Sequence, residues 1–143
     1  MPRSPVCVDA NLVVALVTTE AQSKRALVLW AEWMRSNARV IAPTLLRYEV
    51  TSALQRKGLR GVLSAQDARR ALEQALSLDI ELLDPPTLSL CAFDLAARFN
   101  RPAAYEAHYM ALAEILKAEF WTADERLYNA VREDFPHIYW LGD

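Results

Sequence analysis

The chain has 143 residues, of which 53% are hydrophobic and 24% charged, and its formal net charge at pH 7 is −2. This composition is typical of a globular protein, and the length predicts a single domain over residues 1–143 with a sizeable core. The small net charge excludes a polybasic arm. Any nucleic acid would therefore have to be bound by a local group of arginines.

The cysteines and the N-terminus indicate the compartment. Cys7 and Cys91 have no CxxC spacing and fall in apolar runs, so both are expected to be buried thiols in a reducing environment. The N-terminal segment has no apolar stretch of signal-peptide length, and no run approaches the roughly 20 apolar residues that span a bilayer. We therefore expect a cytoplasmic protein without a membrane anchor.

Short apolar runs alternate with amphipathic runs along the whole chain. The predicted strands are 5–8, 40–42, 81–83, 119–121 and 138–141. The predicted helices are 10–18, 23–37, 43–57, 64–78, 87–99, 103–115 and 122–133, and glycines 58 and 61 are expected to stop the third of them. This alternation predicts a mainly parallel sheet with helices on both faces. With three glycines in the chain, a glycine-rich nucleotide-binding loop is excluded.

Two aspartates follow predicted strands, where open parallel sheets form their sites. Asp9 comes directly after the first strand, and Asp124 lies in WTADERL after the fourth. Each also has a purely structural explanation. Asp9 would serve as the N-cap of the next helix, and Asp124 would favour a helix dipole in a first turn capped by Thr122 and Glu125. The residues alone leave these alternatives open.

Two glutamates lie on helix faces that are expected to meet the core. Glu49 falls within the apolar stripe of PTLLRYEVTSALQRKG, and Glu106 lies one turn ahead of the stripe in AAYEAHYMALAEI. A glutamate at the margin of a stripe can extend its carboxylate to solvent, which is the simpler explanation for either residue alone. Together with the two aspartates, however, they form a set of acids that would repel one another without a cation. Carboxylates without histidine or cysteine favour a hard divalent metal such as Mg²⁺ over zinc.

The segments VCVDAN, PTLLRYEVTSAL, YEAHYMALAE and WTADERL, in this order, resemble the PIN-domain ribonucleases. The likeness is greatest to the single-domain, VapC-like toxins of bacterial and archaeal toxin–antitoxin pairs. It implies a three-layer α/β/α fold with a mainly parallel sheet and an endoribonuclease site that depends on Mg²⁺ or Mn²⁺. It also implies an RNA substrate, a cognate antitoxin and a homodimer.

The resemblance also assigns site residues. The matching positions are the catalytic acids Asp9, Glu49, Glu106 and Asp124, with Asn11 and Thr122 in support. Position 106 departs from the family pattern, which usually has aspartate there. Glutamate keeps the charge but lengthens the arm by roughly 1.5 Å. Mg²⁺ demands near-ideal geometry, so this departure puts the activity of the site in question.

The resulting hypothesis is metal-assisted hydrolysis of RNA. Asp9, Asp124 and Glu106 would hold the metal, and Glu49 would bind a second metal or position the attacking water. The candidates for contact with RNA phosphates are Arg47, Arg56 and Arg126, with Lys57 and Arg60 nearby, although ordinary surface charge is the simpler explanation for each of them.

Two other functions stay open at this point. One is a catalytically weak or inactive PIN-like interaction module, which the glutamate at 106 favours, with a partner surface around Trp30, Trp33 and Met34. Ordinary core packing is the simpler explanation for at least two of these three residues. The other is an aspartyl-phosphate hydrolase with Asp9 as its nucleophile. That chemistry requires a second acid where Asn11 stands and a lysine, for which Lys117 is the candidate.

Overall fold

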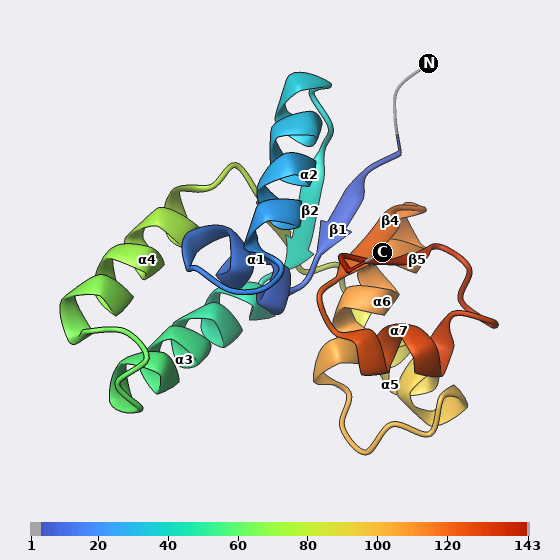
Figure 1. The fold of residues 1–143 in the computed structure, drawn as a ribbon. Helices are drawn as coiled ribbons and strands as arrows, with labels where there is room; N and C mark the ends of the chain where they lie inside the picture. The colour runs from blue at the N-terminus through green and yellow to red at the C-terminus, as the bar shows by residue number, and fades with distance from the viewer. Residues whose placement is uncertain (1–3, 143) are drawn as a thin grey trace.

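A five-stranded parallel sheet forms the centre of the protein in a computed structural model that describes residues 4–142 (Figure 1). The strands lie in the order β3-β2-β1-β4-β5, and every neighbouring pair is parallel. Their bounds are β1 Val6–Val8, β2 Val40–Pro43, β3 Glu81–Leu83, β4 Glu119–Thr122 and β5 Ile138–Trp140. The sheet confirms the prediction of a parallel core.

Helices cover both faces of this sheet. They are α1 Ala10–Val17, α2 Ser23–Arg35, α3 Leu45–Leu59, α4 Ala65–Ser77, α5 Leu88–Arg98, α6 Tyr105–Leu116 and α7 Glu125–Val131. Connections between parallel strands are right-handed, and the chain reverses its direction across the sheet after β3. Figure 1 accordingly shows α1 to α4 on one side and α5 to α7 on the other. The fold is therefore the expected three-layer α/β/α sandwich.

The core lies on both faces of the central strands. All three residues of β1 are fully buried, as expected for a strand that is covered on both sides. The segment from Tyr109 to Ala113 in α6 is buried without interruption, because this helix contacts β1, β2 and β4. Cys7 is buried in β1 and Cys91 is half-buried in α5, and both are free thiols.

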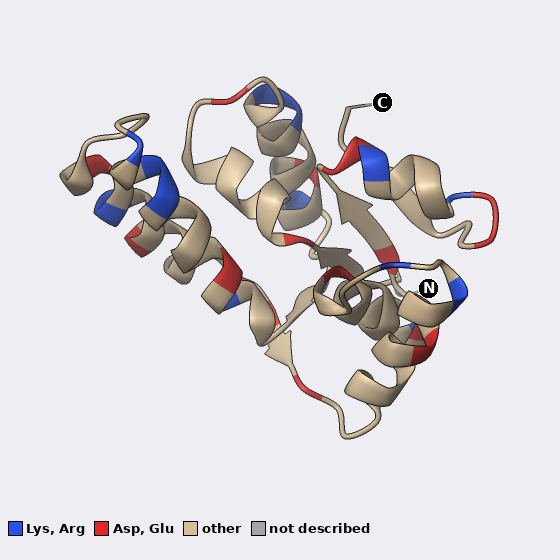
Figure 2. Ribbon diagram, turned by 90° about the horizontal axis from the view of Figure 1, so that it is seen from below, with Lys and Arg blue, Asp and Glu red and all other residues tan. Residues whose placement is uncertain are grey.

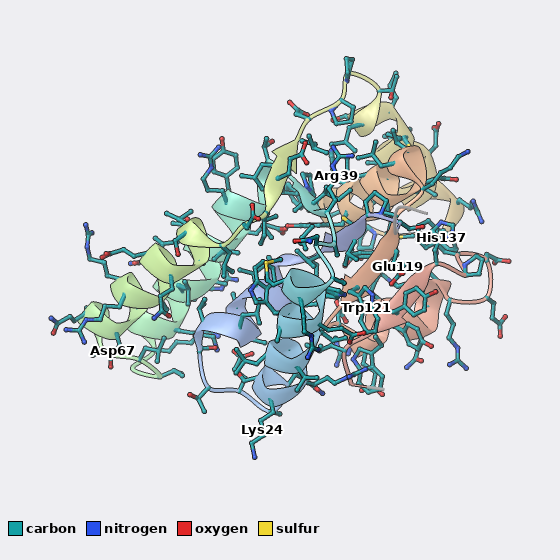
Figure 3. The ribbon with its side chains drawn as sticks, turned by 90° about the horizontal axis from the view of Figure 1, so that it is seen from above. Lys24, Arg39, Asp67, Glu119, Trp121 and His137 are labelled. Carbon is teal, nitrogen blue, oxygen red and sulfur yellow. The ribbon has the colours of Figure 1, made fainter. Side chains whose placement is uncertain are left out.

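An aromatic cluster fixes α2 against β4. Trp33 makes an edge-to-face contact with Trp121 at 5.9 Å, and Trp121 stacks on Tyr139 at 5.1 Å. The Trp121 indole donates a hydrogen bond of 3.0 Å to Glu119, and Figure 3 shows these two residues close together along β4. Trp33 is fully buried, while Trp30 and Met34 are half-buried and pack against the core. Core packing, the simpler explanation from the sequence, therefore holds for Trp33, which cannot belong to a free partner surface.

Most predicted boundaries lie within two residues of the observed ones. The helix predicted at 43–57 begins at Leu45 and ends at Leu59, so Gly58 does not stop it as expected. Glycine costs about 1 kcal/mol inside a helix, and the packing of α3 against α4 holds the helix through that position. The chain then turns at Gly61, whose φ of +75° suits glycine. Within residues 4–142, none of the helices is long and apolar enough to cross a membrane.

Candidate active site

A pocket opens at the carboxyl ends of β1 and β4, where the chain connections diverge to opposite sides of the sheet. Open α/β sheets form their binding crevices at this kind of switch point. The pocket encloses about 130 Å³, and we call it the acidic pocket because four carboxylates line it: Asp9, Glu49, Glu106 and Asp124. The structure therefore brings together all four acids that the sequence analysis selected from four separate elements.

Asp9 is the most buried of the four carboxylates, with 7% of its surface exposed. It is the N-cap of α1, and its Oδ1 accepts a hydrogen bond of 2.9 Å from the backbone N–H of Leu12. Its Oδ2 accepts from the hydroxyl of Thr122 at 2.5 Å. Burial raises the pKa of Asp9 to about 6, although these hydrogen bonds oppose the rise, and the charge of Asp124 adds to it. The capping role and the pocket role therefore belong to the same side chain.

Thr122 and Asp124 divide their roles differently from the prediction. Thr122 is the fully buried last residue of β4, and its hydroxyl oxygen accepts a 2.9 Å hydrogen bond from the backbone N–H of Asp124. Asp124 is the N-cap of α7, and its Oδ1 accepts from the backbone N–H of Leu127 at 3.2 Å. The expected helix start at Thr122 is wrong because this residue still pairs with Trp140 in the sheet and its hydroxyl is bound to Asp9.

Glu49 reaches the pocket from α3 and is held by a residue from a distant part of the chain. The hydroxyl of Tyr109 in α6 donates a hydrogen bond of 2.5 Å to its Oε1. Burial and then Glu49 itself raise the pKa of Tyr109 far above its usual value, so the phenol stays protonated and remains a donor. The sequence analysis missed this role of Tyr109. The signal was available, because a buried tyrosine hydroxyl needs a partner.

Glu106 is bound to an arginine that the sequence analysis also missed. The Nε and Nη2 atoms of Arg101 lie 2.7 and 2.6 Å from its Oε1. Arg101 follows α5, where Asn100 has a φ of +54° and the backbone N–H of Arg101 donates to the carbonyl of Ala96. The five-residue spacing between the two partners crosses a loop, so no helical periodicity could reveal the pair.

The remaining predicted site residues divide into two groups. Asn11 and Arg56 line the acidic pocket, whereas Arg47 and Arg126 do not. Arg47 lies beside a different, largely apolar pocket next to Val50 and Leu82.

Two further side chains also lie away from the acidic pocket. His108 lies beside Ser89, with 3.1 Å between its Nε2 and the serine hydroxyl. Lys117 lines a different pocket near His137, and no lysine among residues 4–142 lines the acidic pocket, as the aspartyl-phosphate mechanism would require.

The acids of the pocket fit a hard divalent cation. All of their donor atoms are carboxylate oxygens, and the charge of Asp124 adds to the effect of burial in raising the pKa of Asp9, so a cation between these two acids would be stabilised. Among residues 4–142, no group of three or more acids, histidines or cysteines is placed so that it could hold a metal ion as it stands. Mg²⁺ typically takes one or two carboxylates and keeps several waters, so Asp9 and Asp124 alone match its usual protein ligands.

Comparison with known proteins places the chain in a family. It matches the PIN domain model over residues 6–133. It is 30% identical over 131 residues to the VapC ribonuclease Mb0985 of Mycobacterium bovis and to ribonuclease VapC9 of Mycobacterium tuberculosis, and both alignments cover 92% of this chain and 94% of the relative.

Two solved structures share the fold. PAE2754 from Pyrobaculum aerophilum matches with a TM-score of 0.71 and 21% identity, over 96% of this chain and 91% of that one. Mycobacterium tuberculosis VapC20, a toxin that cleaves the sarcin–ricin loop, matches with a TM-score of 0.65 and 18% identity, over 91% of this chain and 95% of that one. With this fold, this pocket and a family match over most of its length, the chain belongs to the PIN domain family.

Proposed function

We propose that this protein is a metal-dependent endoribonuclease and the toxin of a toxin–antitoxin pair. The observation that carries the proposal is the convergence of Asp9, Glu49, Glu106 and Asp124 on one pocket at the switch point of the sheet. The names of the VapC relatives, which describe ribonucleases, support the same activity. The reaction is hydrolysis of a phosphodiester bond in RNA.

Asp9 and Asp124 would hold Mg²⁺ or Mn²⁺, because they follow adjacent strands and their charges already interact. When bound, such an ion lowers the pKa of a water and neutralises charge that develops on the phosphate. Thr122 positions both aspartates, since its hydroxyl donates to Asp9 and accepts from the backbone of Asp124. A single buried hydroxyl therefore sets the spacing between the two proposed ligands.

Glu49 would orient the attacking water. Tyr109 occupies its Oε1, and Oε2 accepts no hydrogen bond from any residue between 4 and 142. This second oxygen is therefore left to accept a hydrogen bond from a water in the pocket. Because Tyr109 stays protonated, it fixes the direction of the carboxylate across the physiological pH range.

Glu106 would complete the metal site from the first turn of α6. Both contacts from Arg101 fall on Oε1, so Oε2 is the atom through which Glu106 would act, directly or through water. Arg101 also restrains the longer arm that distinguishes this chain from the usual family pattern. We also propose that the protein is bound by a cognate antitoxin, forms a homodimer and is located in the cytoplasm, as expected of a VapC-like toxin.

The test is cleavage of a single-stranded RNA by the purified protein with Mg²⁺ or Mn²⁺, and with EDTA as the metal-free control. We expect cleavage that requires the metal and is abolished by Asp9→Asn, which keeps the shape of the side chain and its capping of α1. Thr51→Ala is a matched control, because Thr51 is exposed on α3 and does not line the acidic pocket. Equal cleavage by the wild type and Asp9→Asn would refute the proposed site.

A second candidate function rests on the pair of Arg101 and Glu106. An arginine that already neutralises one acid of the pocket favours a protein that binds partners through this fold without cleaving RNA. No cleavage with either metal, together with intact binding of an antitoxin, would support this interaction module over the nuclease.

A further inference from the structure

A second pocket adjoins the acidic pocket along α3, and its charge has the opposite sign. It encloses about 340 Å³ and shares three lining residues with the acidic pocket: Asn11, Ala53 and Arg56. We call it the basic pocket, because its other charged lining residues are Lys57, Arg60 and Glu20. The two pockets therefore lie next to each other, and the charge of their lining changes from acidic to basic.

One face of α3 runs along both pockets. Glu49, Ala53, Arg56 and Arg60 are spaced at i, i+4, i+7 and i+11, which places them on one side of the helix. At 1.5 Å per residue, Arg56 lies about 10 Å and Arg60 about 16 Å along the axis from Glu49. Ala53 presents only a methyl group between the acid and the arginines. Its small side chain contributes to the lining of both pockets.

Among the residues that the structure describes, two of the three cations in the basic pocket form no ion pair. Lys57 forms an ion pair of 2.6 Å with Glu20. Arg56 donates to the hydroxyl of Ser52 at 3.0 Å, but neither Arg56 nor Arg60 forms an ion pair within residues 4–142. Cations near the end of a helix also interact favourably with its dipole, which explains their sign. The helix dipole does not account for a basic pocket that shares part of its lining with the acidic pocket.

The charge along the rest of the surface is mixed. Figure 2 shows Lys and Arg on several elements, interspersed with Asp and Glu. On α4, for example, Arg69 and Arg70 lie 3.5 and 3.7 Å from the carboxylates of Glu73 and Asp67. The unpaired arginines beside the acidic pocket are therefore distinguished by their surroundings as well as by their charge.

We propose that the basic pocket is a binding site for the RNA backbone, in which Arg56 and Arg60 hold the phosphates next to the one that is cleaved. The inference rests on the proposed function, because it takes the scissile phosphate to lie in the acidic pocket. Guanidinium groups suit this role, since their planar donors bind phosphate oxygens in pairs. The exposed amide of Asn11, which lines both pockets, adds a donor for a phosphate or a ribose hydroxyl at the junction.

A substitution at Glu20 should strengthen the proposed RNA site. Glu20 is paired with Lys57, so Glu20→Gln would leave Lys57 as a third unpaired cation in the basic pocket. A loss of RNA affinity can result from misfolding, so a variant that is expected to gain affinity is the sharper test. The backbone N–H of Glu20 donates to Ser23, and this contact does not depend on the side chain.

The experiment measures the binding of a fluorescently labelled single-stranded RNA in EDTA, by anisotropy, over a series of salt concentrations. Each phosphate contact contributes about 0.7 to the slope of log affinity against log salt for single strands. We expect the double substitution Arg56→Gln with Arg60→Gln to reduce the magnitude of this negative slope by about 1.4 and to weaken binding at least tenfold. Glu20→Gln should increase the magnitude of the slope by about 0.7 and tighten binding.

The matched control is Arg69→Gln with Arg70→Gln, which removes the same charge from α4 and should leave the slope unchanged. Equal losses in the two double variants would overturn the proposal, because they would show general attraction rather than a site. An unchanged slope in the Arg56 and Arg60 variant would overturn it as well.

A parallel cleavage assay with Mg²⁺ or Mn²⁺ separates this proposal from the nuclease assignment. If the wild type cleaves RNA and the Arg56 and Arg60 variant binds RNA as well as the control variant does, the proposed RNA site is wrong and the nuclease assignment is supported. If the wild type does not cleave RNA but only the Arg56 and Arg60 variant loses binding, the RNA site is supported and the nuclease assignment is wrong.

Discussion

The two aspartates and the two glutamates of the acidic pocket are held in place by different means. Asp9 and Asp124 follow neighbouring strands and cap the helices that start there, so backbone N–H groups fix their carboxylates. Glu49 and Glu106 extend from helices and are fixed by the side chains of Tyr109 and Arg101. The position of the aspartates follows from the fold itself, whereas that of the glutamates depends on two particular partners.

The largest expected effect comes from a change that separates the two roles of Asp124. Asparagine caps a helix about as well as aspartate, while alanine does not. We expect Asp124→Asn and Asp124→Ala both to lower RNA cleavage by about 10²- to 10³-fold, because a metal ligand should matter at least as much as the groups that orient it. Only the alanine variant should also lose about 1 kcal/mol of unfolding free energy. Cleavage rates and urea denaturation measure the two effects, and full activity in Asp124→Asn would show that its charge is not needed.

The aspartates were accessible from sequence because strand ends and helix starts carry local signals. Asp9 directly follows a short apolar run, and the order of strands in a doubly wound sheet brings it beside Asp124. The partners of the glutamates carry no such signal. Tyr109 lies 60 residues from Glu49 in the chain, and Arg101 contacts Glu106 across a loop, so both contacts depend on tertiary packing.

The misplaced start of α7 has a similar cause. The segment from Thr122 to Glu125 has the spacing of a capping box, but the sheet keeps Thr122 as a strand residue and the buried Asp9 takes its hydroxyl. Tertiary contacts therefore overrode the local pattern at the point where the site is assembled.

The next effect concerns the stability of the metal-free protein. Burial raises the pKa of Asp9 from 3.8 to about 6, so between these values the folded protein binds this proton more tightly than the unfolded chain does. The contribution of Asp9 to stability is therefore most favourable below pH 4 and falls as the pH rises through 6. Asp9→Asn removes this loss, and in EDTA we expect it to be more stable than the wild type by roughly 2–3 kcal/mol above pH 7.

Denaturation of both proteins at a series of pH values measures this difference. The advantage of Asp9→Asn should grow between about pH 4 and 6 and then level off. A difference that is independent of pH would mean that the buried charge is not its cause.

A smaller effect is expected on the glutamate side, from Tyr109→Phe. The substitution removes the hydroxyl that fixes Glu49 and leaves the ring stacked on Phe120. We expect cleavage to fall about tenfold, with a loss of about 1 kcal/mol in stability, which is the usual contribution of one hydrogen bond. Binding of Mn²⁺, measured by calorimetry, should not change. Tyr48→Phe is the control, because Tyr48 is exposed on α3, and an equal loss of activity there would contradict the role of Tyr109.

The smallest effect tests whether Arg101 and the metal compete for Glu106. The two side chains of this ion pair are 25% and 33% exposed, and such a pair contributes less than about 1 kcal/mol. Arg101→Gln should therefore tighten the binding of Mn²⁺ by no more than about fivefold.

Glu106→Asp withdraws the carboxylate by roughly 1.5 Å, which is enough to break its contact with Arg101. In the Glu106→Asp variant, the further substitution Arg101→Gln should leave the affinity for Mn²⁺ unchanged, because Arg101 no longer contacts the carboxylate. Calorimetry on the wild type, the two single variants and the double variant gives this coupling directly. If Arg101→Gln has the same effect with aspartate at position 106 as with glutamate, Arg101 acts on the metal through the general charge of the pocket and not through Glu106.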